Sequence, residues 1–216
     1  MPPKIQALPG PEGGFVARDG STLRRARRLH ALPRVGRILG IDPGLHRTGY
    51  GMIELRIADC GLRIGSTKNP QSAVNNPQLI EGGVLKAKAT DPLPQRLQTL
   101  YDSLCEVLHE HAPEVVVVEE MFSTYAHPRS ALLMAQARGV LLLAAQQSNV
   151  AVHSFLPNEV KQVLTGNGHA TKSAMQAAVR SRLRLAAVPE PPDVADALAL
   201  ALCFAARQSV GQRLGG

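Results

Sequence analysis

The chain has 216 residues, and a hydrophobic fraction of 44% is enough for the core of one ordinary domain. A formal net charge of +7 favours a polyanionic partner such as a nucleic acid, although basicity alone does not establish one. Three scattered cysteines argue against a disulfide framework and a zinc site, and the lack of a secretory signal or of an apolar run of about 18 residues predicts a cytoplasmic protein with no membrane partner.

Residues 1–36 form a distinct first segment, which is rich in proline, glycine and arginine and includes GSTLRRARRLH. This composition, without apolar periodicity, predicts a basic arm that lacks fixed structure. Two explanations stay open: the arm contacts DNA phosphates, or it is a translation-start artefact ahead of the real domain. A transit peptide is a weaker third explanation.

From Arg37 onward the pattern changes to strands. RILGID (37–42) and TGYGMIEL (48–55) predict two short strands, with a Pro-Gly turn signal between them. The polar stretch 58–76 predicts a long loop or an insertion, and IEGGVLKA (80–87) predicts a third strand.

Helices and strands alternate in the rest of the chain. Leucines at helical spacing predict an amphipathic helix over 92–113, and the run EVVVVEE (114–120) predicts a strand buried on both faces. The later segments predict, in order, a helix at 129–149, a strand at 150–156, helices at 157–166 and 172–183, and a buried helix at 193–209. This order predicts an α/β fold in which helices cover a sheet.

Several acidic residues lie at the ends of elements that are predicted to be buried, where an apolar side chain would be easier to bury. Asp42 follows ILGI, Glu119 and Glu120 follow VVVV, and Asp193 and Asp196 open the last helix. Singly, these positions have plain structural explanations: an Asx turn, a solvated strand end, and a capped helix start. Together, two strands that each end in a carboxylate, and a helix with acids at i and i+3 on one face, favour a single cluster.

Such a cluster requires cations, because like charges a few ångströms apart oppose one another strongly. Oxygen-only ligands suit Mg²⁺, with Mn²⁺ as a plausible substitute. Two such ions about 3.5–4 Å apart can activate a water molecule and stabilise the leaving oxygen of a phosphodiester. We therefore expect Asp42 to be a metal ligand in a site with two ions.

Five separated blocks of the chain resemble, in order and spacing, the RuvC family of Holliday-junction resolvases. They are ILGIDPGLHRTGYGMI, VVVVEEMF, LLMAQARGVLLLAA, NEVKQVLTGNGHATK and DVADALALALC. The resemblance implies an RNase H-like fold, a mixed sheet with helices on both faces. It also implies a homodimeric, Mg²⁺-dependent endodeoxyribonuclease that makes paired nicks in four-way DNA junctions during recombination and repair. We therefore expect an arm at 1–36, a nuclease domain at 37–207 and a C-terminal tail at 208–216.

By motif, the catalytic and metal-binding acids of the family fall on Asp42, Glu119, Asp193 and Asp196. Glu119 is preferred to Glu120 because it matches the spacing of the family motif. Adjacent side chains of a strand also point to opposite faces, so only one of the two glutamates can face the cluster.

The resemblance also implies DNA-binding residues. Phe122 matches an aromatic residue that stacks on junction bases, although core packing explains it equally well. Lys161 and Lys172 match basic residues near the DNA backbone at the scissile site, although each could be a solvated lysine on a helix face. His46 and Arg47, close to Asp42 in the sequence, receive no role.

Several partners and activities stay open. The helix at 129–149 carries apolar residues on more than one face, which predicts a dimer interface; a fully buried monomer helix is the alternative. The resemblance leaves open a branch-migration helicase complex of the RuvA and RuvB type. The alternative activities are another RNase H-fold nuclease acting on RNA or simpler branched DNA, a junction-binding scaffold that does not cleave, and, more remotely, an actin-like ATPase.

Overall fold

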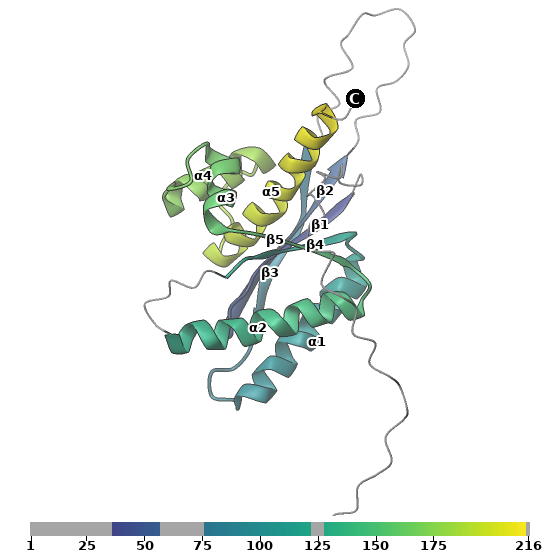
Figure 1. Cartoon of the computed structure of the whole chain (residues 1–216), viewed down its shortest axis with the longest axis vertical. Helices are drawn as coiled ribbons and strands as arrows, with labels where there is room; N and C mark the ends of the chain where they lie inside the picture. Colours follow the sequence, from purple (N-terminus) through teal and green to yellow (C-terminus); the bar gives the residue numbers. More distant parts are fainter. Residues whose placement is uncertain (1–35, 57–75, 122–127, 215–216) are drawn as a thin grey trace, which may run out of the picture. The chain divides into compact units, whose positions relative to one another are not determined.

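The structure, a computed structural model, describes residues 36–56, 76–121 and 128–214. Its strands are β1 (Arg37–Asp42), β2 (Arg47–Arg56), β3 (Asn76–Lys86), β4 (Val115–Glu119) and β5 (Ala151–Phe155). They form one five-stranded sheet in the order β3-β2-β1-β4-β5 (Figure 1). The sheet is mixed, because β1, β2 and β3 pair antiparallel whereas β4 and β5 run parallel to β1.

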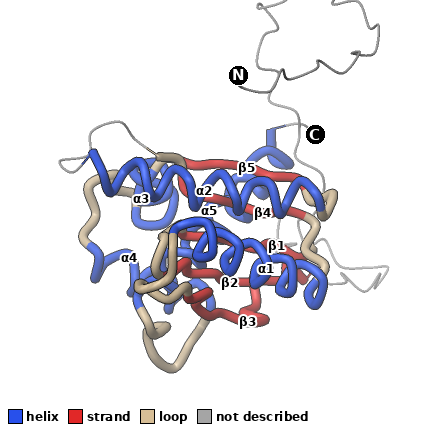
Figure 2. The backbone as a smooth tube through the Cα atoms, turned by 90° about the horizontal axis from the view of Figure 1, so that it is seen from below, coloured by secondary structure: helices blue, strands red, loops and turns tan. Residues whose placement is uncertain are grey.

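Helices cover both faces of this sheet. They are α1 (Leu93–His111), α2 (Pro128–Gln147), α3 (Pro157–Thr165), α4 (Lys172–Leu183) and α5 (Pro192–Leu214). Helices α1 and α2 pack on one face and α3, α4 and α5 on the other; Figure 2 views the molecule from the side of α1 and α2. The predicted α/β fold with a mixed sheet and helices on both faces is confirmed. Among the described helices, none has the length and apolar character needed to cross a bilayer.

Two element boundaries differ from the prediction. Strand β3 begins at Asn76, inside the polar stretch expected to be a loop, because its first residues pair with the end of β2, with Pro77 opposite Leu55. Helix α5 continues to Leu214, through most of the expected tail, and Gln208 is buried in it. Residues 57–75 and the expected arm up to residue 35 lie outside the described residues.

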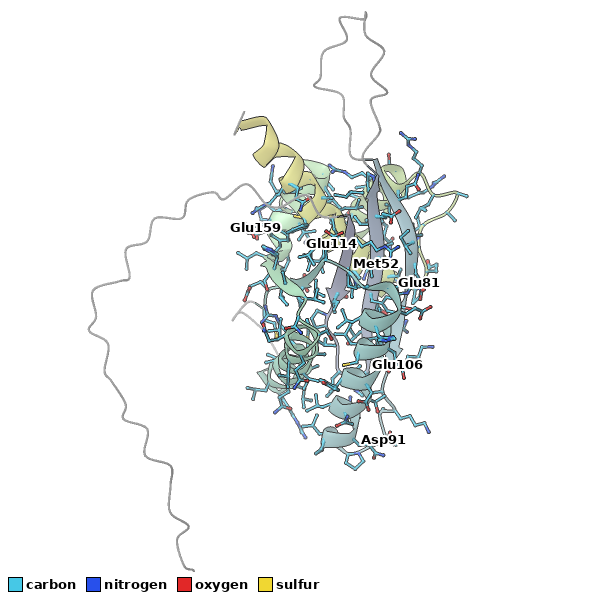
Figure 3. The ribbon with its side chains drawn as sticks, turned by 90° about the vertical axis from the view of Figure 1, so that its right-hand side faces the viewer. Met52, Glu81, Asp91, Glu106, Glu114 and Glu159 are labelled. Carbon is cyan, nitrogen blue, oxygen red and sulfur yellow. The ribbon has the colours of Figure 1, made fainter. Side chains whose placement is uncertain are left out.

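The strands alternate between two cores. On β4, Val115 and Val117 belong to the core that contains α5, whereas Val116 and Val118 belong to the core that contains α1 and α2. Met52 of β2, labelled in Figure 3, lies in the second core. The continuous valine run is therefore explained by burial on both faces, and the face of each following residue can be read from its position.

Glycines on the strands let α5 lie directly against the sheet. A Cβ atom on Gly40 would lie 1.9 Å from the carbonyl oxygen of Ala197, and one on Gly49 would lie 2.1 Å from that of Asp193. Any side chain at these positions would push the helix away. The small residues Ala195, Ala197 and Ala199 on α5 are buried as well, so the close contact depends on both elements.

We expect Gly40→Ala to lower the free energy of unfolding by about 3 kcal/mol, because the new methyl group meets helix backbone that cannot rotate away. Denaturant unfolding measures the loss. Gly168→Ala is the matched control, since the nearest atom to its new Cβ would be 3.4 Å away. Equal stability of Gly40→Ala and wild type would show that α5 does not pack this closely.

Candidate active site

Four acidic side chains come together where two central strands end. Asp42 is the last residue of β1 and Glu119 the last residue of β4; these strands are parallel, and Ile41 lies opposite Val118 just before them. By strand alternation, Asp42 shares the face of Gly40 and Glu119 that of Val117, which is the face covered by α5. Asp193 and Asp196 lie at the start of α5, on that same side of the sheet.

The raised pKa of Asp42 indicates that all four acids lie close together. Burial and then the negative charges of Glu119, Asp196 and Asp193 raise the pKa of Asp42 from its ordinary value of 3.8 to about 7. Burial, followed by the charge of Asp196, also raises the pKa of Glu119. Burial and the repulsion among the acids together favour the protonated form of Asp42 when no cation is bound.

Basic side chains offset part of this repulsion. The Nζ atom of Lys172, at the start of α4, donates a hydrogen bond to Oδ2 of Asp196 at 2.9 Å, and this bond raises the pKa of Lys172. The Nη2 atom of Arg47 lies 3.0 Å from Oδ2 of Asp193. Arg47, which received no role from the sequence, is thus the counterion of one predicted ligand.

A hollow of about 260 Å³ opens over the acids. Its polar lining consists of Asp42, Glu119, Asp196, Lys161 and Lys172, and its apolar wall comes from α3, α4 and α5. The two lysines expected to contact DNA therefore lie in the same hollow as three of the expected ligands. Phe122, the third expected DNA contact, lies outside the described residues.

The donor set fits a hard divalent cation. All four candidate ligands are carboxylates, which is the ligand type that Mg²⁺ and Mn²⁺ prefer. Burial, and then three neighbouring negative charges that Lys172 only partly offsets, raise the pKa of Asp42. A divalent cation held by Asp42, Glu119, Asp193 and Asp196 would remove this repulsion.

The raised pKa of Asp42 predicts that the stabilisation of the fold by a bound metal ion depends on pH. Between about pH 4 and 7 the metal-free folded protein keeps a proton on Asp42 that the unfolded chain has lost, so its stability falls as pH rises. A cation must displace that proton, so we expect the Mn²⁺-induced rise in melting temperature to grow as pH passes through about 7. Thermal unfolding with and without Mn²⁺ across this range tests it. A pH-independent rise would contradict the titration of Asp42.

Two further arginines hold the elements that carry the acids. Arg96 of α1 is buried; its Nη2 donates to the carbonyl oxygen of Leu45 and lies 3.0 Å from Nδ1 of His46, in the turn that follows Asp42. Arg138 of α2 lies 3.5 Å from Oε2 of Glu120. The structure thus places Glu119 with the acids and Glu120 on the α2 side of the sheet. In the sequence, Arg96 lies four residues before Leu100 on the buried stripe of α1, a signal that could have identified it, whereas no such pattern marks Arg138.

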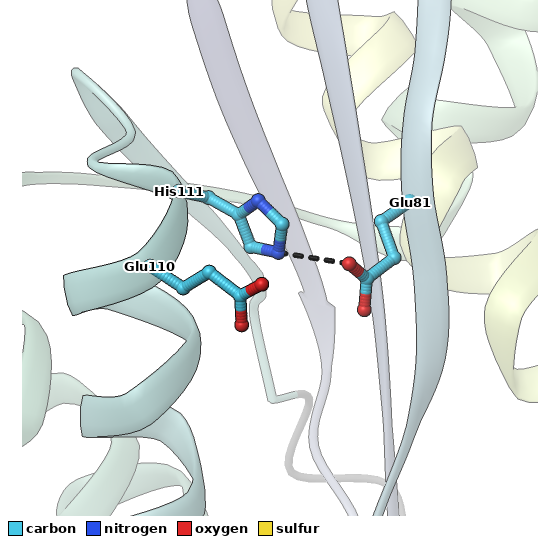
Figure 4. A group of neighbouring side chains, drawn as sticks. All are labelled: Glu81, Glu110 and His111. Carbon is cyan, nitrogen blue, oxygen red and sulfur yellow. Dashed lines mark ion pairs between the residues drawn. The ribbon is translucent and has the colours of Figure 1, made fainter.

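A second group of potential ligands lies on the opposite face of the sheet. It consists of Glu81 on β3 and of Glu110 and His111 at the end of α1, whose ligand atoms lie within 4.8 Å of one another (Figure 4). The Nε2 atom of His111 is 2.9 Å from Oε2 of Glu81, and the hydroxyl of Tyr50 donates to the other oxygen of Glu81. These contacts join α1 to β3, so the group has a structural explanation apart from the hollow.

Comparison with known proteins agrees with this geometry. The family described as Crossover junction endodeoxyribonuclease RuvC matches residues 38–204. The protein of that name from Rhodopirellula baltica is 43% identical over 179 residues, which is 82% of this chain and 91% of that protein. The one from Pelotomaculum thermopropionicum is 41% identical over 168 residues, which is 78% of this chain and 92% of that protein.

Solved structures give the same result. The structure of Thermus thermophilus RuvC matches with 34% identity and a TM-score of 0.67, covering 83% of this chain and 96% of that chain. The complex of T. thermophilus RuvC with a Holliday junction substrate matches with 30% identity and a TM-score of 0.67, over the same shares of each chain. The matches confirm the RNase H-like fold and the resemblance seen in the sequence. The chain belongs to the RuvC family of crossover junction endodeoxyribonucleases.

Proposed function

We propose that this protein resolves four-way DNA junctions by hydrolysing phosphodiesters at a divalent-metal site formed by Asp42, Glu119, Asp193 and Asp196. The observation that carries the proposal is the convergence of four carboxylates from β1, β4 and α5, of which Asp42, Glu119 and Asp196 line one hollow and Asp193 adds its charge beside Asp42. Family membership makes the chain an endodeoxyribonuclease, and its T. thermophilus relative has been solved with a Holliday junction substrate. The specific ion, Mg²⁺ with Mn²⁺ as a substitute, and the number of two ions are part of the proposal.

The protein supplies placement and charge. A bound divalent cation lowers the pKa of water and stabilises negative charge on the phosphate oxygens. Asp42 and Glu119 sit at the ends of paired central strands, so the sheet fixes their separation, whereas the start of α5 fixes Asp193 and Asp196. This rigid arrangement holds the ligands in place before the substrate arrives.

Two lysines in the hollow are proposed to contact the DNA backbone. Lys161 on α3 and Lys172 on α4 both line it, and their positive charges oppose the repulsion among the acids. We propose that each binds a phosphate next to the scissile bond, which neutralises charge and supports affinity. Phe122, three residues after Glu119, is proposed to stack on a junction base, and the basic arm is proposed as a further contact with phosphates.

Paired cutting requires two sites, and α2 offers a surface for a second copy. An exposed row follows this helix, which we call the α2 stripe: Leu132, Ala135, Gln136, Gly139 and Leu143. Leu132 is 67% exposed and Leu143 50%, whereas Leu141 faces the core and is fully buried. A Cβ atom on Gly139 would meet nothing within 4 Å, so another helix can approach closely there. We propose a homodimer whose two-fold axis matches that of the junction.

Two further proposals concern location and partners. We propose a cytoplasmic location, as the sequence predicted, and a branch-migration helicase complex of the RuvA and RuvB type as a partner on the same junction. The nuclease domain at 37–207 is the unit that we propose performs the reaction.

The test is a cleavage assay with a synthetic four-way junction, beside a duplex and an RNA–DNA hybrid of the same sequence. We expect Mg²⁺-dependent paired nicks in the junction, no comparable cutting of the two controls, and loss of activity with a chelator. Preferential cutting of the hybrid would favour an RNase H-type activity instead. Junction binding without any cutting would favour a scaffold.

A further inference from the structure

We infer that Arg138 is the positioning residue that keeps Glu119 turned toward the other acids, an inference that rests on the proposed role of Glu119. Arg138 lies on α2, on the face of the sheet opposite the hollow, and its side chain is only 17% exposed. Its Nε donates to the backbone carbonyl of Glu119 at 3.0 Å. Its Nη2 donates to Oγ of Ser154 at 2.8 Å and lies 3.5 Å from Oε2 of Glu120.

These contacts link the ends of the two neighbouring strands β4 and β5. Val118 pairs with Ser154 and Glu119 with Phe155, so Arg138 spans the last paired residues of β4 and β5. Beyond them, the amide of Glu120 donates to the carbonyl oxygen of Phe155 at 2.8 Å. The side chain of Arg138 thus holds the backbone of β4 at the residue that carries the candidate ligand.

The ion pair with Glu120 sets the direction of Glu119. Two glutamates follow the valine run, and a one-residue slip of the strand end would exchange the faces to which they point. Arg138 draws Glu120 toward α2, and by strand alternation Glu119 then points to the α5 side. Losing the arginine would leave the carbonyl of Glu119 without this donor and Glu120 without this counterion.

Three acceptors at different positions call for a guanidinium. Arginine offers five N–H donors in a planar fork, whereas lysine offers one compact charge on a flexible stem. We therefore expect Arg138→Lys to keep the ion pair with Glu120 but to lose at least one of the hydrogen bonds to the Glu119 carbonyl and the Ser154 hydroxyl. Its effect should fall between those of wild type and Arg138→Met.

The test measures Mn²⁺ binding by calorimetry in the absence of DNA, and the Mg²⁺ concentration that gives half-maximal junction cleavage. We expect Arg138→Met to weaken Mn²⁺ binding and to raise the required Mg²⁺ about 10-fold or more, with Arg138→Lys intermediate. Junction affinity without metal should stay the same. Arg182→Met is the matched control, because Arg182 also donates to backbone carbonyls, those of Val163 and Leu164.

The outcomes separate this inference from the proposed function. Equal Mn²⁺ affinity in wild type and a folded Arg138→Met protein would overturn the inference, whatever the cleavage assay gives. If Arg138→Met does not fold, the same comparison with Arg138→Lys decides. A wild type that binds Mn²⁺ at the acids but never cuts junctions would overturn the proposed function, and weaker Mn²⁺ binding by Arg138→Met would still support the positioning role.

Discussion

Replacing Asp42 by asparagine should slow junction cleavage by at least about 100-fold while leaving junction binding nearly unchanged. Asparagine keeps the shape of the side chain but removes the negative charge that a divalent cation requires. Because burial and three neighbouring acids raise the pKa of Asp42 to about 7, removing its charge should not destabilise the metal-free protein. Single-turnover nicking in Mg²⁺ and a gel-shift titration without metal measure the two effects.

The control for this substitution is Asp102→Asn on α1. Asp102 is exposed and accepts a hydrogen bond from Gln98, which an asparagine oxygen can also accept. Its cleavage rate should equal that of wild type. Nicking by Asp42→Asn at a near wild-type rate would remove Asp42 from the reaction.

The second large effect is expected from Leu143→Glu on the α2 stripe. A charge at this half-exposed position should leave the monomer folded but weaken the dimer about 30-fold or more, because the carboxylate would be buried without a partner in the interface. The variant should then give single nicks in place of paired ones. Sedimentation gives the oligomeric state, and a supercoiled plasmid bearing an extruded cruciform distinguishes linear from nicked product.

Ile80→Glu on β3 serves as the control, since Ile80 is another exposed apolar residue, with 43% of its surface accessible, and lies away from α2. It should remain dimeric and make paired nicks. A wild type that is monomeric at micromolar concentration without DNA would contradict a preformed dimer, and assembly on the junction would have to replace it.

Local patterns were enough to predict most of the fold. The valine run of β4 and the leucine spacing of α1 predicted these elements, because burial imposes a period of two or of about 3.6 residues. The start of β3 could not be predicted in this way. Asn76 and Pro77 join the sheet through pairing with Arg56 and Leu55 of β2, which lie twenty or more positions earlier.

The positions of two candidate ligands could be predicted, because each is an acidic residue at the end of an apolar strand. Asp42 and Glu119 follow apolar strands directly, so the sequence alone placed them at one edge of a sheet. Arg47 and Arg138 were missed, because an arginine on a strand or helix looks like any solvated cation until its tertiary partner is known. The close approach at Gly40 was missed for the same reason, since only the packed helix shows why a side chain is excluded there.

The central claim is that the four acids on the α5 side of the sheet hold the catalytic cations, and the adjacent pair Glu119 and Glu120 tests it most directly. The two residues share the strand end but lie on opposite faces, one among the acids and the other beside Arg138. The measurement is the rate of junction cleavage in Mg²⁺ by Glu119→Gln and Glu120→Gln under identical conditions. We predict loss of cleavage in Glu119→Gln and at most a partial reduction in Glu120→Gln. Full activity in Glu119→Gln with loss in Glu120→Gln would contradict the assignment of the site.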